Sequence, residues 1–264
     1  MSPDFSAHIS WLFGELPYLQ RPAAARAAGL RWIETAWPSP AERERLHEAV
    51  AEAGVGVALL NCDAGDVGNG ERGYLNDPAR RGEAERAFLA AAELAAQLGA
   101  PNLNLLVGRH LPGVPRARQR ETVLEALRDF APEAAARGLR ILLEPVNAIE
   151  HPGFLAPTPQ AAAELIRESG ADGVGLLLDV YHLARAGDDP LAAIDRHGEL
   201  IGHVQIADFP GRHQPGTGAV DIAAILSHLG AAGYSGRIGL EYEPLGTTED
   251  SLAFLAPARA PIHP

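Results

Sequence analysis

The feature that most constrains the fold is a regular alternation of apolar, β-rich runs with Ala-rich helical stretches along the whole chain. We expect strands at 8–13, 31–37, 56–62, 103–108, 140–146, 174–180, 202–208 and 237–243. Helices are expected at 17–28, 40–53, 79–98, 115–137, 158–169, 188–198, 219–232 and 247–256. Apolar strands that alternate with helices are typical of a parallel sheet buried on both faces. Eight such units favour closure into a (β/α)8 TIM barrel, so residues 1–264 are predicted to form one α/β barrel domain.

Four of the expected strands end in side chains with oxygen atoms that bind hard metal ions. These are Glu144, Asp179, Gln205 and Glu241, separated by 35, 26 and 36 residues. One βα unit of a barrel has about 30 residues, so the four side chains should converge at the carboxyl ends of neighbouring strands. Several carboxylates in one barrel mouth repel each other unless a cation is present. The set therefore predicts a divalent metal site, with Mg²⁺ or Mn²⁺ favoured by the oxygen ligands.

Other polar side chains near these strand ends are candidates for binding a substrate. His182 follows Asp179 by three residues, and Glu150 and His151 lie in the stretch after Glu144. A solvated loop charge, or a histidine bonded to backbone at a helix start, is the alternative for each of them.

Arginines in the loops are candidates for binding a substrate carboxylate, because a planar guanidinium matches a carboxylate bidentately. Two glycine-rich polar loops, 63–78 and 208–218, follow the third and seventh expected strands and contain Arg72 and Arg212. Arg109 follows the fourth strand. Three aromatic residues at the ends of the first two strands either line the same mouth or pack in the core: Trp11, Phe13 and Trp37.

Composition excludes several classes of function. The net charge of −12 argues against a nucleic-acid partner and against attraction to a membrane surface. All 22 basic residues are arginine, so Schiff-base chemistry and a Walker-A phosphate site, which both need lysine, are excluded. The single cysteine, Cys62, rules out an internal disulfide and is expected to be a packed residue. No signal peptide or membrane span is apparent, and a cytoplasmic protein is expected.

Seven motifs together resemble the hydroxypyruvate isomerase family, a branch of the xylose-isomerase-like barrels. They are SWLFGE (10–15), AGDVGNGERG (64–73), LEPVN (143–147), LLDVYH (177–182), HVQIAD (203–208), PGTG (215–218) and LEYEP (240–244). The resemblance runs in order over residues 5–256.

The resemblance implies an aldose–ketose isomerase with one metal ion held by the quartet at 144, 179, 205 and 241. Ketose epimerases of the wider superfamily usually have histidine at the position of Gln205, and glutamine is similar to the isomerase branch. Related epimerases have substrate contacts that match Glu150, His182 and Arg212. The glutamate at 150 resembles the epimerases, whereas the isomerases often have aspartate there. Arg109 replaces a lysine that is common after the fourth strand.

The expected reaction interconverts hydroxypyruvate and tartronate semialdehyde, or an equivalent 2-oxo sugar acid, through an enediolate. Glu144 and Glu241 are the expected acid–base pair. The alternatives are a 2-oxotetronate isomerase, a ketose 3-epimerase and a barrel that binds sugar acids without catalysis. A DNA-repair nuclease is disfavoured by the acidic charge. A small-molecule sugar acid is the expected partner, and a homo-oligomer is compatible with the sequence.

Overall fold

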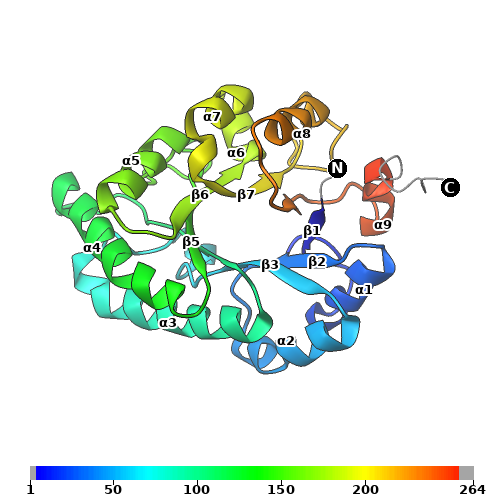
Figure 1. The fold of residues 1–264 in the computed structure, drawn as a ribbon, viewed down its shortest axis with the longest axis horizontal. Helices are drawn as coiled ribbons and strands as arrows, with labels where there is room; N and C mark the ends of the chain where they lie inside the picture. The colour runs from blue at the N-terminus through cyan, green and yellow to red at the C-terminus, as the bar shows by residue number, and fades with distance from the viewer. Residues whose placement is uncertain (1–3, 256–264) are drawn as a thin grey trace.

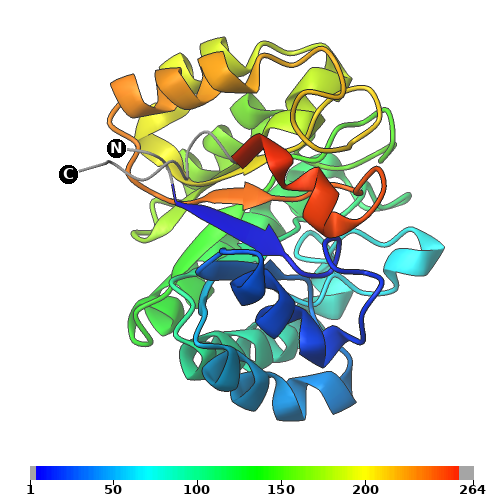
Figure 2. The same cartoon turned by 90° about the vertical axis from the view of Figure 1, so that its right-hand side faces the viewer.

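Residues 4–255, which the computed structural model describes, confirm the (β/α)8 barrel (Figure 1). Eight parallel strands close into a ring in chain order, with β1 paired to both β2 and β8. Figure 2 shows β1 and β8 side by side, with their carboxyl ends on the same side. The strands are β1 (Phe5–His8), β2 (Trp32–Thr35), β3 (Gly56–Asn61), β4 (Asn102–Leu105), β5 (Arg140–Leu143), β6 (Val174–Asp179), β7 (Ile201–Ile206) and β8 (Ile238–Leu240).

Helices surround this ring. They are α1 (Arg21–Ala27), α2 (Pro40–Ala53), α3 (Arg81–Leu98), α4 (Arg116–Ala135), α5 (Pro159–Ser169), α6 (Val180–Ala186), α7 (Pro190–His197), α8 (Ile222–Ala231) and α9 (Thr248–Ser251), with short 3-10 turns at Tyr18–Gln20, Val67–Asn69, Pro78–Arg80 and Gly198–Leu200. Helix α2 shows how the sequence sets the helix ends: Ser39 and Glu42 form a capping box at its start, and Gly54 ends it in the left-handed conformation. None of the helices between residues 4 and 255 is long and apolar enough to cross a membrane.

Two expectations about the secondary structure were wrong. The first strand is Phe5–His8 instead of 8–13, and the chain from Ile9 onward turns. The second difference is α6, which begins directly after Asp179 because the Oδ1 atom of Asp179 accepts a hydrogen bond from the backbone N–H of Tyr181 (2.8 Å). Residue 256 of the last expected helix lies outside the described residues.

The main hydrophobic core lies between the strands and the helices. Phe88 of α3 and Phe130 of α4 are buried in it with their rings stacked, centroids 4.3 Å apart. A separate cluster of Leu59, Leu142 and Leu177 comes from β3, β5 and β6. These leucines lie two residues before Asn61, Glu144 and Asp179, so they share the inward face of their strands with site residues.

The part of the barrel interior near β1, β2 and β7 is polar. Ser6, His8, Glu34 and His203 are all at most 1 % exposed. Barrel interiors are usually filled by branched apolar side chains, and polar groups there need hydrogen-bond partners. One part of the interior is leucine-filled, and the other is a polar network beneath the site in which Ser6, Glu34 and His203 are hydrogen-bonded. The two ring nitrogens of His8 have no hydrogen-bond partner among the described residues.

Candidate active site

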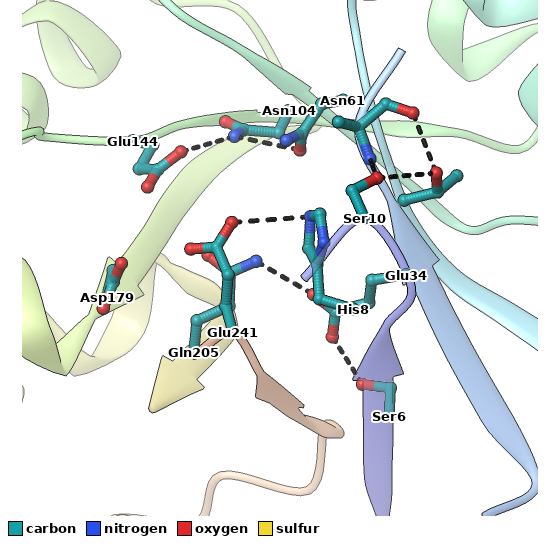
Figure 3. Close-up of polar contacts among 12 residues, drawn as sticks. Ser6, His8, Ser10, Glu34, Asn61, Asn104, Glu144, Asp179, Gln205 and Glu241 are labelled. Atoms are coloured by element: carbon teal, nitrogen blue, oxygen red, sulfur yellow. Dashed lines mark hydrogen bonds and ion pairs between the residues drawn. The ribbon is translucent and has the colours of Figure 1, made fainter. Parts of the chain in front are cut away.

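The four predicted oxygen donors meet at the carboxyl ends of β5 to β8 (Figure 3). Asp179 ends β6 and pairs in register with Gln205 of β7, while Glu144 and Glu241 directly follow β5 and β8. Asp179 and Gln205 are fully buried, and Glu144 and Glu241 are 8 % and 7 % exposed. The two glutamates therefore face the cavity, with Asp179 and Gln205 beneath its surface.

The three carboxylates are crowded together in a buried place, and this changes their acidity. Burial and the neighbouring Asp179 raise the pKa of Glu144 to about 7, although a hydrogen bond from Asn104 Nδ2 to Glu144 Oε2 (2.7 Å) opposes the change. Burial also raises the pKa of Asp179 and of Glu241, against the attraction of Arg212. Glu144 thus exchanges a proton near neutral pH, as a general acid or base requires.

Arg212 is the positive charge closest to this cluster. One terminal nitrogen (Nη2) donates to Glu241 Oε2 (2.6 Å) and to Asp179 Oδ2 (3.2 Å). The guanidinium lies against the rings of Trp11 and Tyr181, at 4.5 and 4.9 Å from the ring centroids. Its Nε is buried and has no partner within residues 4–255. Nη1 makes no hydrogen bond to a described residue either, so Arg212 lines the cavity with unpaired N–H donors.

The loop after β7 is built around Asp208, which explains how the sequence places Arg212. The buried carboxylate of Asp208 accepts four backbone N–H groups, from Phe209, Gly216, Gly218 and Val220, at 2.9–3.0 Å. A Cβ on Gly218 would lie only 2.0 Å from the carbonyl oxygen of Phe209, so the last glycine of the PGTG motif is sterically required. Arg212 itself has φ 54°, a left-handed conformation that the surrounding loop must hold.

His182 is oriented by a relay that begins at Glu150. The backbone N–H of Glu150 donates to Asn147 Oδ1 (2.9 Å), and Asn147 Nδ2 then donates to Nδ1 of His182 (2.7 Å). Nδ1 is thus an acceptor, and the ring proton is on Nε2, which lies 3.6 Å from Asp179 Oδ2 and 3.7 Å from Glu144 Oε1. Burial and Arg212 hold the pKa of His182 well below its usual range. The neutral imidazole of His182 therefore offers its Nε2–H to the cavity.

Glu150 also lines the cavity, but its carboxylate already has partners. Its Oε1 accepts from the Tyr181 hydroxyl (2.6 Å) and from Arg185 Nε (3.1 Å), and its Oε2 accepts from Asn147 Nδ2 (3.1 Å). The neighbouring His151 lines the cavity too, and burial and Arg72 lower its pKa to about 4.

The structure separates two of the predicted arginines. Arg72 lines the cavity, with Nη1 donating to the carbonyl oxygens of Glu71 (2.7 Å) and Val67 (3.0 Å). Arg109 is not among the lining residues. Its guanidinium donates to the carbonyl oxygen of Pro152 (2.6 and 2.9 Å) and of Gly70 (3.1 Å), so it joins the loops after β3 and β5.

The cavity at this end of the barrel has a volume of about 550 Å³. Trp11 and Trp37 form part of its wall, whereas Phe13 is buried in the core. Cys62 also borders the cavity, but burial and Asp63 raise the pKa of its thiol to about 12. Cys62 is therefore an unreactive thiol at neutral pH.

Sequence reasoning missed the polar residues that support the quartet. Asn104 bonds Glu144 and Asn61, and His8 Nε2 lies 3.4 Å from Glu241 Oε1. Burial lowers the pKa of His8 to about 4, so its ring is neutral. The signal that was available is the period of two along a strand. Asn104 and His8 each lie two residues after another polar residue, Asn102 and Ser6, so β4 and β1 alternate between polar and apolar residues.

The residues present fit a divalent cation. Gln205 Oε1 is buried and has no hydrogen-bond partner in the described part of the chain. Glu144, Asp179 and His182 also offer ligand atoms within 4.8 Å of one another. The proton on His182 Nε2 makes this ring a donor rather than a ligand, so Gln205 Oε1 completes an all-oxygen set with the three carboxylates. This buried group can hold a metal.

Comparison with known proteins gives consistent matches. Residues 22–258 match the sequence family described as xylose isomerase-like TIM barrel. The hydroxypyruvate isomerase of Escherichia coli is 33% identical over 255 residues, covering 97% of this chain and 99% of that protein. The 2-oxo-tetronate isomerase of Haemophilus influenzae is 30% identical over 250 residues, covering 95% and 97%. A crystal structure from Brucella melitensis, titled AP endonuclease, family 2, is 31% identical with a TM-score of 0.93, covering 97% and 99%.

Proposed function

The chain belongs to the xylose isomerase-like TIM barrel family and is an isomerase, and we propose that it interconverts hydroxypyruvate and tartronate semialdehyde. One observation carries this proposal. Two buried glutamates with raised pKa values, Glu144 and Glu241, face one cavity beside a cationic donor, Arg212. An aldose–ketose isomerisation needs this combination, because a proton leaves one carbon and returns to its neighbour.

The proposed proton path uses the two glutamates. One of them removes a proton from the hydroxymethyl carbon of hydroxypyruvate, and the other delivers a proton to the former carbonyl carbon. The hydroxyl proton passes from the oxygen of the hydroxymethyl carbon to the former carbonyl oxygen. The hydroxymethyl carbon becomes the aldehyde, and the carbonyl carbon becomes the hydroxyl-bearing centre, so no atoms are gained or lost. Both glutamates face the cavity, so either can act as the base and the other as the acid.

Other side chains bind and orient the substrate in this proposal. The Nε2–H of His182 and the unpaired Nη1 group of Arg212 donate to its oxygens. Arg72, at the rim, attracts its carboxylate. The carboxylate of Glu150 acts through Asn147 and Tyr181, which it holds in place. Arg109 was also a candidate for the carboxylate, but its position favours a role in holding the loops.

We propose Mg²⁺ or Mn²⁺ as the ion held by Glu144, Asp179, Gln205 and Glu241, since all four donors are oxygens. When bound, it supplies Lewis-acid stabilisation of the negative charge that develops on the substrate oxygens.

A second candidate substrate is a four-carbon 2-oxo acid, the 2-oxotetronate class. The cavity of about 550 Å³ is larger than a three-carbon acid needs. A relative named for this activity is also 30% identical over 250 residues.

The test is NMR in D2O with Mg²⁺-loaded protein and, separately, hydroxypyruvate, a 2-oxotetronate and a neutral ketose. We expect deuterium to enter hydroxypyruvate while tartronate semialdehyde appears. Glu144→Gln and Glu241→Gln should each slow the exchange by about 10²–10⁴-fold. Glu52→Gln, on the exposed side of α2, is the matched control.

Exchange confined to the four-carbon acid would move the chain to the second candidate, and exchange confined to ketoses would make it an epimerase. Metal binding with no exchange in any of the three would indicate a barrel that only binds sugar acids. Unchanged rates in both glutamine variants would refute the proton path.

A further inference from the structure

Below the proposed metal ligands lies a carboxylate that the proposed reaction does not use. Glu34 of β2 is fully buried inside the barrel. Its Oε1 accepts from the hydroxyl of Ser6 and pairs with His203 Nε2 (2.7 Å), while its Oε2 accepts from Gln205 Nε2 (2.9 Å). The two oxygens thus have separate partners, and only Oε2 contacts a residue of the quartet (Figure 3).

The neighbouring strand leaves room for this carboxylate. Gly239 of β8 lies in register between Ser6 and Gln205. A Cβ at Gly239 would lie 2.4 Å from Glu34 Oε1 and 2.7 Å from both Glu34 Oε2 and Gln205 Cγ. Real Cβ atoms do not approach other atoms so closely, so glycine at 239 is a steric condition for the contact between Glu34 and Gln205.

The contact determines which end of the Gln205 amide is available to a ligand. An ionised carboxylate accepts hydrogen bonds and cannot donate them. It therefore selects the NH2 end of the amide and leaves the carbonyl end, Oε1, without a partner among residues 4–255. If the amide were reversed, two oxygens would face each other at Glu34, and an NH2 group would face the cation site.

We propose that Glu34 is a positioning residue that fixes the amide of Gln205 with Oε1 toward the metal, so that Gln205 acts as a ligand. The inference rests on the proposed metal site. Residues that orient metal ligands typically change metal affinity 10–100-fold when they are mutated. Glu34 acts on the metal only through Gln205, so its loss should weaken binding of the ion before any substrate is added.

The test measures the Kd of Mn²⁺ for the substrate-free protein, with water-proton relaxation as the readout. Glu34→Gln introduces an NH2 group that donates to Gln205 Oε1 and turns the amide over, so we expect Kd to rise about 10–100-fold. Ser6→Ala is the matched control, because it removes a hydrogen bond to the same carboxylate without contacting Gln205. It should leave Kd within about threefold, even if the protein melts at a lower temperature.

A double variant provides a rescue. In Glu34→Gln with Gln205→Glu, donor and acceptor exchange places, and an oxygen again faces the metal, so Mn²⁺ affinity should return. Because a carboxylate at 205 by itself binds a cation more strongly than an amide, the reference for the rescue is Gln205→Glu alone. A higher affinity in the double variant than in Gln205→Glu supports the inference, and an equal affinity contradicts it. Should Glu34→Gln not fold, slow hydrogen exchange of the Gln205 side-chain NH2 in the Mg²⁺-loaded wild type supports the inference, and rapid exchange contradicts it.

The outcomes are distinguishable. Wild-type protein that binds no Mn²⁺ refutes the metal site, and the inference with it. Wild-type binding with an unchanged Kd in Glu34→Gln refutes the role of Glu34 alone and leaves the proposed function intact.

Discussion

Replacing Glu144 by glutamine is expected to stabilise the metal-free protein at neutral and alkaline pH. Burial and Asp179 raise the pKa of Glu144 from 4.5 to about 7. A carboxyl group with a raised pKa in the folded state stabilises the fold fully below its unfolded pKa, and this contribution is lost as the pH rises through the folded pKa. Each pH unit between the two values corresponds to about 1.4 kcal/mol. The wild type should therefore lose about 3 kcal/mol between pH 4.5 and pH 7 from this group.

The assay is thermal unfolding in EDTA from pH 4.5 to pH 8, with the wild type and Glu144→Gln side by side. Glutamine has nearly the same shape but no charge, so the difference between the two proteins isolates the ionisation of Glu144 and its repulsion of Asp179 and Glu241. For a domain of this size about 3 kcal/mol corresponds to about 6–12 °C in Tm. A metal ion that binds only the folded state raises Tm. Mn²⁺ should raise the Tm of the wild type more than that of Glu144→Gln, because the variant lacks one of the proposed carboxylate ligands.

Two results would refute this reasoning. A difference in Tm that does not change with pH would mean that the Glu144 carboxyl has an ordinary pKa. A variant that loses stability relative to the wild type as the pH rises would mean that Glu144 is better stabilised when charged. Glu52→Gln, on an exposed helix position, should show no such pH-dependent difference.

Three further predictions concern the site and the core. EDTA should abolish deuterium exchange and Mn²⁺ or Mg²⁺ should restore it; exchange that survives complete metal removal would contradict the metal site. Asn104→Ala removes the hydrogen bond that opposes the high pKa of Glu144, so the acidic limb of the pH–rate profile should move to higher pH, and an unmoved limb would count against this contact. Phe88→Ala should cost about 3–5 kcal/mol in urea unfolding, because Phe88 is 1 % exposed and stacked on Phe130; a cost below about 1 kcal/mol would show that the site repacks.

The barrel was predictable because most of its strands are apolar on both faces and five of the helices in residues 4–255 have glycine at the C-cap: α2, α3, α5, α6 and α7. The first strand was misplaced for a physical reason. Its inward face is Ser6 and His8, which belong to the polar network, so the run FSAH is less apolar than the turn sequence that follows it. Helix α6 was missed because Asp179 both ends a strand and caps a helix, with no intervening loop residues in the sequence to mark the boundary.

The positions of Glu144, Asp179, Gln205 and Glu241 could be predicted because each of these residues comes at the end of an apolar strand sequence. The supporting residues could not, because Glu34 and His203 pair only when β2 and β7 face each other across the closed barrel. The arginines were equally beyond prediction. Whether a loop guanidinium lines the cavity depends on loop conformation: Arg72 lines it, whereas Arg109 joins two loops.

Arg109 has a consequence for the motion of the mouth. It binds the carbonyl oxygens of Gly70 and Pro152, and the backbone N–H of His110 donates to Gly153 (2.6 Å), so the loops after β3 and β5 are fastened to each other through the segment after β4. Displacing either loop alone would break charge-assisted bonds, whereas displacing both together would keep them. The rim that carries Arg72 and His151 should therefore move as one unit.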